Sequence, residues 1–255
     1  MTVHVVGAGP GAADLLTLRA VGLLGVADVV LYPGTYLDEA VLSHCRSGAR
    51  LVDTARLDLD AILAVMTEAH ARGEDVVRLV SGDPSLYSAL HEQAARLDAA
   101  GVPWEVVPGV PAYAAAAALV GRELTVPLVA QSVVLTRTRA RSSAMPEGET
   151  WEAFAATGAT LVLHLAITRL REHLDRLLPT HGADCPVVVV HRASQPGELV
   201  LRGTVGGPAC VADAVEAAGL RQAAVVLVGR ALGESVDAAG ESWLYAAHRP
   251  RGAPH

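Results

Sequence analysis

The chain contains no lysine, because all 20 of its basic residues are arginine. Without a lysine amine it cannot form a Schiff base with a carbonyl group or pyridoxal phosphate, and it cannot supply the lysine of a Walker A loop. Aromatic residues are scarce, with one phenylalanine, so the sequence offers no series of rings on which nucleic-acid bases could stack. The formal net charge of −7 is a further argument against a nucleic-acid partner.

Cysteine and long apolar runs are also rare. Cys45, Cys185 and Cys210 are scattered and odd in number, so they predict buried thiols in a reducing compartment, with no disulfide framework and no metal site. The longest apolar run, Ala112–Val120, is too short to cross a membrane. The N-terminal region lacks the basic stretch and cleavage site of a signal peptide. We therefore expect a cytoplasmic protein that does not enter the membrane.

Apolar residues make up 51% of the 255 residues, enough to form a packed core in one large or two modest domains. In the first half, short apolar runs alternate with stripes at helical spacing. This pattern predicts an α/β fold with a mostly parallel sheet covered on both faces. The runs are Val3–Val6, Val29–Leu31, Val76–Val80 and Trp104–Val107.

The second half begins after a change of character at Gly121–Ala130, which we interpret as an inter-domain linker. Val187–His191 and Leu199–Val205 flank a short polar loop and predict a hairpin, which indicates a mixed sheet. The expected organisation is an N-terminal α/β domain (1–120), the linker (121–130), a C-terminal α/β domain (131–237) and a tail (238–255).

Three glycine-containing turns follow apolar strands of the first half. They read Gly7-Ala8-Gly9-Pro10-Gly11, Ser81-Gly82-Asp83-Pro84 and Pro108-Gly109-Val110-Pro111. Glycine lets a backbone approach a ligand closely, and open α/β sheets bind ligands at the carboxyl ends of their strands. We therefore expect a ligand site at this edge. The alternatives are tight turns without a ligand and a simple helix cap by Asp83.

The first turn also fits the dinucleotide fingerprint G-x-G-x-x-A. That fingerprint requires an acidic residue at the carboxyl end of the second strand, where it binds the ribose. Asp28 has about the right spacing but precedes the strand Val29–Leu31. The sequence therefore disfavours a nicotinamide or flavin enzyme.

The order of the three turns resembles that of the tetrapyrrole methyltransferase family, whose usual forms are GxGPGxxxLLTxxA, GGDP and VPGVTS. Here Gly7–Ala20 reads GAGPGAADLLTLRA, and the resemblance extends from about Val3 to Leu232. Ser81 replaces a glycine or threonine. Pro111-Ala112 replace a pair that contains hydroxyls, so hydrogen bonds at that point must come from the main chain.

The resemblance implies a homodimer of chains with two α/β domains, a parallel five-stranded N-terminal sheet and a mixed C-terminal sheet. It implies S-adenosylmethionine in the cleft between the domains, with S-adenosylhomocysteine as product, and a tetrapyrrole above it. The implied cofactor residues are Pro10, Ser81, Gly82, Asp83, Leu86, Pro111, Ala112, Leu165, Ala193 and Ala224. The implied substrate side comprises Gly7, Gly9, Gly11, Tyr32, Tyr87, Arg137 and Arg141. No catalytic residue is assigned, because a reduced tetrapyrrole carbon is itself nucleophilic. His164 or Tyr32 could relay a proton. For His164, the alternative is a packing role in the core.

The segment Leu135-Thr136-Arg137, followed by Arg139, Arg141 and Met145-Pro146-Glu147, resembles the branch that methylates C11 of precorrin-4 to give precorrin-5 in cobalamin biosynthesis. Arginines also suit a polycarboxylate, because guanidinium binds carboxylates through two hydrogen bonds. For Arg139, a solvated loop is an equal alternative. Methylation of another ring position or of diphthamide, a dinucleotide-dependent oxidoreductase and a non-catalytic cofactor sensor stay open as alternatives.

Overall fold

The computed structural model describes residues 1–34, 37–137 and 144–233. The chain forms two compact units. The first comprises Met1–Ala115 together with Arg192–Glu198; the second comprises Ala116–His191 and the chain from Leu199 onward. The chain passes from the first unit to the second within helix α4, Ala112–Val120. The domain boundaries inferred from the sequence stay a prediction.

The first unit is built on a five-stranded sheet in which every pair of neighbours is parallel, as expected. The strand order is β3-β2-β4-β1-β5. The apolar runs of the sequence form four of these strands, because the strands of a parallel sheet that helices cover are largely apolar. The strands are β1 (Val3–Gly7), β2 (Val29–Tyr32), β3 (Arg50–Asp53), β4 (Val76–Val80) and β5 (Trp104–Val107).

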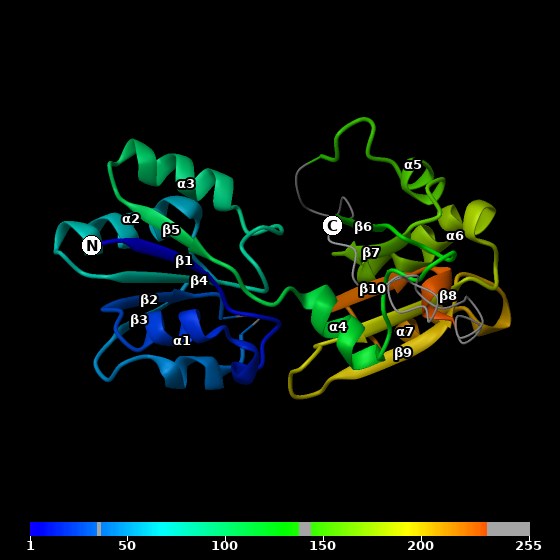
Figure 1. The fold of residues 1–255 in the computed structure, drawn as a ribbon, viewed down its shortest axis with the longest axis horizontal. Helices are drawn as coiled ribbons and strands as arrows, with labels where there is room; N and C mark the ends of the chain where they lie inside the picture. The colour runs from blue at the N-terminus through cyan, green and yellow to red at the C-terminus, as the bar shows by residue number, and fades with distance from the viewer. Residues whose placement is uncertain (35–36, 138–143, 234–255) are drawn as a thin grey trace, which may run out of the picture. The chain divides into compact units, whose positions relative to one another are not determined.

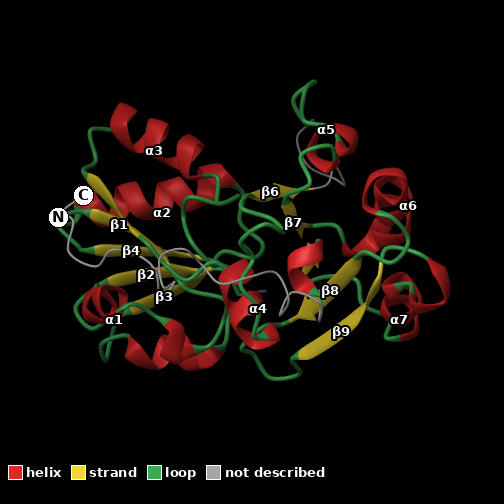
Figure 2. Ribbon diagram, turned by 45° about the vertical axis from the view of Figure 1, so that its right-hand side comes forward, coloured by secondary structure: helices red, strands yellow, loops and turns green. Residues whose placement is uncertain are grey.

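Helices cover both faces of this sheet (Figures 1 and 2). On one face, α2 (Leu59–Ala71) and α3 (Leu90–Ala99) contribute Met66 and Leu97 to the core. On the other face, α1 (Leu18–Leu24) and a 3₁₀ helix, Glu39–His44, contribute Leu24 and Val41. A further 3₁₀ turn, Ala13–Leu15, precedes α1. Both faces are thus closed, and the carboxyl edge remains as the place where loops can form a site.

Local capping explains where these helices begin. The Asp58 side chain accepts a hydrogen bond from the Ala61 amide at 2.8 Å and starts α2, and Thr17 does the same for Ala20 at 3.2 Å in α1. In the sequence, Leu86, Leu90, Ala94 and Leu97 repeat at helical spacing and predict a helix that includes Leu86, but α3 begins only at Leu90. The reason is that Ala89 has a left-handed backbone, with φ of 55°, which interrupts helical geometry.

The second unit contains a mixed sheet, also as expected, with the order β6-β7-β10-β8-β9. β6 and β7 are parallel and the other neighbours are antiparallel. β8 and β9 form the hairpin that the sequence predicts. The strands are β6 (Val133–Arg137), β7 (Thr160–His164), β8 (Pro186–His191), β9 (Leu199–Thr204) and β10 (Ala224–Val228).

Three helices share one core with this sheet: α5 (Trp151–Ala155), α6 (Leu170–His181) and α7 (Val211–Ala217). Short 3₁₀ helices occupy Ile167–Arg169, Gly207–Ala209 and Arg230–Leu232. Within the parts of the chain that the structure describes, no helix combines the length and apolar character needed to span a membrane.

His173 of α6 is an unusual member of this core, because its side chain is only 3% exposed. Its ring lies against the Trp151 ring of α5, with centroids 4.8 Å apart. Among the described residues, neither ring nitrogen has a hydrogen-bond partner. Burial lowers the pKa of His173 to about 4, so the imidazole is neutral at pH 7.

Candidate functional site

The three glycine turns meet at the carboxyl edge of the first sheet, because β1 lies between β4 and β5. The Gly9 amide donates to the Gly82 carbonyl at 3.1 Å, and the Gly82 amide donates to the Gly9 carbonyl at 2.7 Å. A Cβ atom on Gly7 would lie 2.5 Å from the Gly109 nitrogen and 2.7 Å from the Gly82 oxygen. The turns therefore pack backbone against backbone, at a distance that only glycine permits.

Asp83 links the second turn to the third. Its Oδ2 accepts a hydrogen bond from the Gly109 amide at 2.8 Å, and its Oδ1 accepts one from the Ser85 amide at 2.8 Å and another from the Ser85 hydroxyl. Burial raises the pKa of Asp83, but these hydrogen bonds lower it and prevail, so the carboxylate is ionised at neutral pH. Asp83 does not cap α3, whose N-cap is Ala89.

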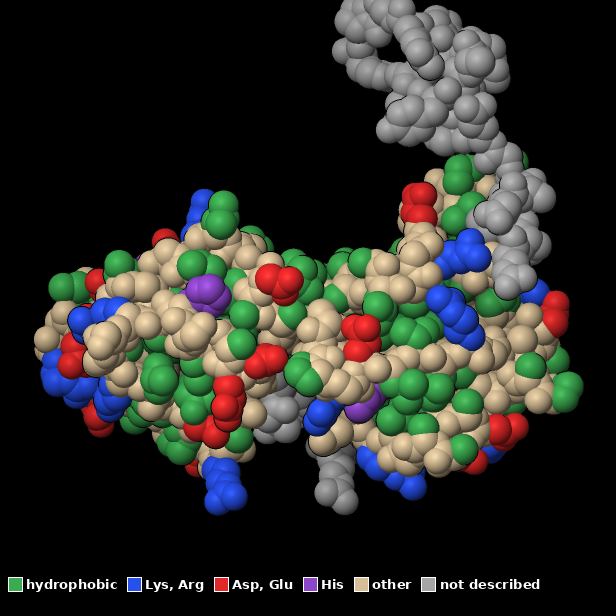
Figure 3. All heavy atoms as spheres, turned by 90° about the horizontal axis from the view of Figure 1, so that it is seen from below, with side chains coloured by type: hydrophobic (Ala, Val, Ile, Leu, Met, Phe, Trp, Pro, Cys, Tyr) green, Lys and Arg blue, Asp and Glu red, His purple; other side chains and the backbone are tan. Residues whose placement is uncertain are grey.

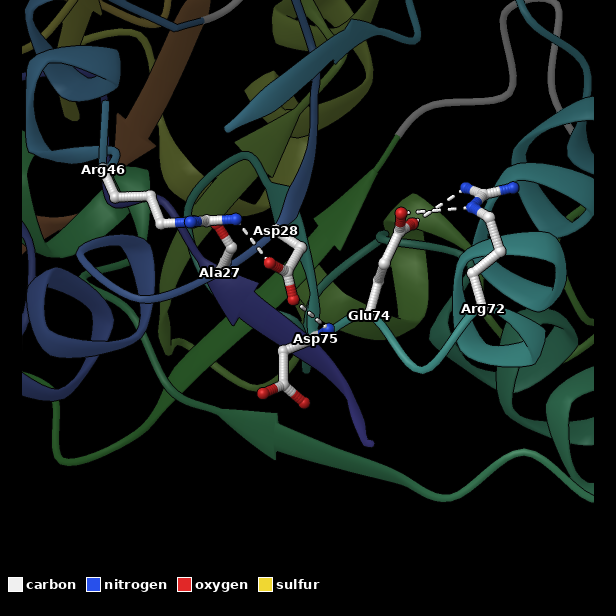
Figure 4. A network of polar contacts seen from close by, with 6 residues as sticks. All are labelled: Ala27, Asp28, Arg46, Arg72, Glu74 and Asp75. Atoms are coloured by element: carbon white, nitrogen blue, oxygen red, sulfur yellow. Dashed lines mark hydrogen bonds and ion pairs between the residues drawn. The ribbon is translucent and has the colours of Figure 1, made fainter. Parts of the chain in front are cut away.

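Asp28 lies at the opposite edge of the sheet, just before β2. Its Oδ2 accepts a hydrogen bond from the Asp75 amide at 2.8 Å, and its other oxygen pairs with Arg46 (Figure 4). The Arg46 Nε also donates to the Ala27 carbonyl at 2.9 Å. Because this acid is held at the amino edge, away from the glycine turns, the geometry argues against a ribose contact of the dinucleotide kind.

Tyr32, the last residue of β2, is fixed through its backbone. Its carbonyl accepts hydrogen bonds from the Thr54 amide at 2.9 Å and the Thr54 hydroxyl at 3.1 Å. The guanidinium of Arg78 in β4 donates to Thr54 Oγ1 at 3.1 Å and to the Leu79 carbonyl at 2.9 Å. Burial lowers the pKa of Arg78 to about 10, which leaves it charged at neutral pH. This chain of contacts ties the carboxyl ends of β2, β3 and β4 together.

The register of the second sheet brings several predicted residues to one edge. Arg137 at the end of β6 pairs with His164 at the end of β7, and Ala224 at the start of β10 pairs with His191 at the end of β8. β10 lies between β7 and β8 and is antiparallel to both, so these positions are neighbours. Leu165 follows β7 with φ of 55° and a half-exposed side chain. Burial lowers the pKa of His164, which favours its neutral form.

The predicted site residues are divided between the two units. The first unit holds the predicted cofactor residues Pro10, Ser81, Gly82, Asp83, Leu86, Pro111, Ala112 and Ala193 and the predicted substrate residues Gly7, Gly9, Gly11, Tyr32 and Tyr87. The second unit holds Leu165, Ala224 and Arg137. Arg139 and Arg141 lie outside the described residues.

Some residues of this edge were not predicted. The side-chain amide of Gln195 donates to the Pro10 carbonyl, although 185 positions separate them. The sequence places Gln195 only in a turn between two strands, and nothing local in it signals the contact. Thr54 and Arg78 were missed for the same reason, since their contacts join different strands of the sheet.

Comparisons with known proteins agree with this geometry. A family model described as tetrapyrrole (corrin/porphyrin) methylases matches residues 2–209. A precorrin-4 C(11)-methyltransferase of Rhodococcus erythropolis is 52% identical over 98% of this chain and 99% of its own length. The solved structure of a cobalt-precorrin-4 methyltransferase, described as a cobalamin biosynthetic enzyme, is 36% identical and has a TM-score of 0.86, covering 91% of this chain and 96% of that one.

A uroporphyrin-III C-methyltransferase of Thermus thermophilus, solved in complex with S-adenosylhomocysteine, is 30% identical with a TM-score of 0.74. The match covers 91% of this chain and 99% of that structure. The family model covers most of the chain, and the relatives match it over nearly its whole length. This chain therefore belongs to the tetrapyrrole (corrin/porphyrin) methylase family.

Proposed function

We propose that this chain transfers the methyl group of S-adenosylmethionine to C11 of precorrin-4, giving precorrin-5 and S-adenosylhomocysteine in cobalamin biosynthesis. The observation that carries the proposal is the meeting of three glycine turns at one sheet edge, tied together through Gly9, Gly82, Asp83 and Gly109. The particular reaction is supported by the 52% identity to the Rhodococcus precorrin-4 enzyme over almost the full length of both chains.

The residues of this edge fit S-adenosylmethionine. A Cβ on Gly109 would lie 2.3 Å from the Gly82 oxygen, so no side chain stands where the turns meet and their main chains pack directly against one another. The residues that would hold the cofactor are Pro10, Ser81, Gly82, Asp83, Leu86, Pro111, Ala112, Leu165, Ala193 and Ala224. When bound, the cofactor supplies a methyl group on a sulfonium, which a carbon nucleophile can displace.

A tetrapyrrole substrate requires local positive charge on this protein. Precorrins carry acetate and propionate groups, whereas the protein has a net charge of −7. On the face shown in Figure 3, acidic and basic side chains are interspersed. Attraction for the substrate must therefore be local, and Arg137 and Arg141 would provide it through charge-assisted hydrogen bonds. Gly7, Gly9, Gly11, Tyr32 and Tyr87 would form the rest of the substrate side.

Catalysis in this proposal depends on position. The ring carbon of a reduced tetrapyrrole is enamine-like and needs little activation, so holding it in line with the methyl group supplies most of the acceleration. The Arg78–Thr54–Tyr32 contacts and the Asp83–Gly109 hydrogen bond keep the edge rigid for that purpose. We assign no general base.

We also propose that the physiological substrate lacks cobalt and that the enzyme acts as a homodimer in the cytoplasm. The relative named for precorrin-4 is 52% identical, whereas the solved enzyme named for cobalt-precorrin-4 is 36% identical. Parallel assays with cobalt-free and cobalt-containing precorrin-4 test whether the substrate lacks cobalt. Light scattering of the purified protein tests whether it is a homodimer.

The decisive experiment is to incubate the protein with precorrin-4 and S-adenosylmethionine that carries a ¹³C-labelled methyl group. Mass spectrometry should show one added methyl, and carbon NMR should place the label on C11. Label on another ring carbon would identify a different member of the same family. Binding of NAD without any response to S-adenosylhomocysteine would overturn the proposal.

A further inference from the structure

The loop between β8 and β9, Arg192–Glu198, belongs to the first unit, although both strands belong to the second. The Ser194 amide donates to the Glu198 carboxylate at 2.6 Å, and the Gln195 amide donates to the Arg192 carbonyl at 2.9 Å. Arg192 and Ser194 have left-handed backbones, with φ of 49° and 64°. Such conformations are costly for residues other than glycine and persist only where surrounding contacts hold them.

The side chain of Gln195 is the contact of this loop with the first glycine turn. Its Nε2 donates to the Pro10 carbonyl, and its amide fills the space beside Gly11. A Cβ on Gly11 would lie 2.3 Å from Nε2 and 2.4 Å from Cδ of Gln195. Gly11 therefore has no side chain at the place where Gln195 packs, and the turn is held from two sides: by Gln195 at Pro10 and by Gly82 at Gly9.

We propose that Gln195 is a positioning residue for the cofactor. It acts through Pro10 by fixing the turn Gly9-Pro10-Gly11 in the conformation that faces S-adenosylmethionine. Loss of the Nε2 donor frees the Pro10 carbonyl, and the turn then samples conformations that do not bind. The inference rests on the proposed function, since it requires that this edge bind the cofactor.

The test compares the wild type with Gln195→Leu, Gln195→Asn and the control Gln131→Leu, in which an exposed glutamine is changed in the same way. Gln195→Leu keeps the volume but removes the donor, and Gln195→Asn keeps the amide on a stem one carbon shorter. Calorimetry should show the dissociation constant of S-adenosylhomocysteine rising about 3- to 10-fold in both, as expected for one lost hydrogen bond. Gln131→Leu should bind like the wild type.

Gln195→Glu separates positioning from simple packing. At pH 7.5 its carboxylate faces the Pro10 carbonyl and cannot donate, so binding should weaken at least as much as in Gln195→Leu. Near pH 4, about the ordinary pKa of a glutamate carboxyl, the protonated fraction can donate, so affinity relative to the wild type at the same pH should recover in part. A packing role alone predicts that Gln195→Leu, which keeps the volume, binds like the wild type.

The two proposals fail in different ways. If the wild type does not bind S-adenosylhomocysteine, the proposed function is wrong. If the wild type binds but Gln195→Leu and Gln195→Asn bind equally well, the function stands and the positioning role is wrong. Weak binding by Gln195→Glu that does not recover at low pH also contradicts the role. Should Gln195→Leu fail to fold, Gln195→Asn and Gln195→Glu decide the question.

Discussion

Replacing Asp83 with alanine removes a side chain that ties the second glycine turn to the third. The Gly109 amide, which donates to Asp83 Oδ2 at 2.8 Å in a partly buried position, loses its acceptor. The Ser85 amide and hydroxyl lose theirs as well, but they lie in the more exposed part of the turn. The main consequence is therefore at Gly109, whose turn should move away from Gly82.

The magnitude follows from the cost of an unsatisfied buried donor, about 1–3 kcal/mol. A loss of about 1–3 kcal/mol in the free energy of binding raises the dissociation constant of S-adenosylhomocysteine about 5- to 150-fold. Calorimetric titration measures this change directly, and thermal unfolding measures the accompanying loss of stability. Affinity should also fall in the wild type as pH falls through the lowered pKa of Asp83, because the protonated carboxyl is a weaker acceptor.

Asp58→Ala is the matched control, because Asp58 also accepts a backbone hydrogen bond, from Ala61 at 2.8 Å, but at the start of α2. It should lower stability by about 1 kcal/mol, the usual cost of a lost helix cap, and leave affinity unchanged. If Asp83→Ala behaves in the same way, with lower stability and unaltered affinity, Asp83 is only a structural acceptor and the reasoning is refuted.

Three further predictions concern other residues. Gly7→Ala should abolish binding of S-adenosylhomocysteine or prevent folding, since its Cβ would lie 2.5 Å from the Gly109 nitrogen; retained affinity in calorimetry would contradict the close packing. Arg137→Ala should weaken precorrin-4 binding by about 1.5–3 kcal/mol, with Arg137→Lys recovering part and cofactor affinity unchanged; equal substrate affinity would exclude the contact. His173 has a pKa of about 4 when folded and about 6.5 when unfolded, so its stabilising contribution is complete above pH 6.5 and is lost as pH falls toward 4. In the wild type, this titration should lower the free energy of unfolding by about 2 kcal/mol between pH 7 and pH 5, and His173→Phe should not show that part of the loss. The measurement is the free energy of unfolding of both proteins as a function of pH, and parallel curves would contradict the prediction.

Much of the fold, and of the candidate site at the carboxyl edge of the first sheet, could be predicted because the sequence patterns that indicate them are local. Apart from His4 and Arg78, Val3–Gly7 and Val76–Val80 are apolar, as buried parallel strands are, and each leads into a glycine-containing turn. The carboxyl ends of parallel strands share an edge, so the turns at Gly82 and Gly109 could be expected on the same side of the sheet, and the strand order β4-β1-β5 brings them together. The polar loop after His191 predicted the β8–β9 hairpin on the same basis.

The elements and contacts that could not be predicted leave no local pattern in the sequence. β3 was missed because Arg50, Leu51 and Asp53 are exposed on an edge strand and do not form an apolar run. α5 was missed because Trp151–Ala155 is too short to show helical periodicity. The Gln195–Pro10 hydrogen bond joins positions 185 residues apart, and only the folded chain brings them together.

The strained backbones provide a separate argument about where function resides. Tyr87, Leu165, Arg192 and Ser194 all have positive φ angles, and each comes shortly after the end of β4, β7 or β8. Glycine would adopt these conformations without strain, so a larger residue there indicates that its side chain is needed. Tyr87 and Leu165 are also half-exposed hydrophobic side chains. Backbone strain and exposed apolar surface coincide at positions that the family resemblance assigns to substrate and cofactor. A ligand bound at these two positions would account for both features.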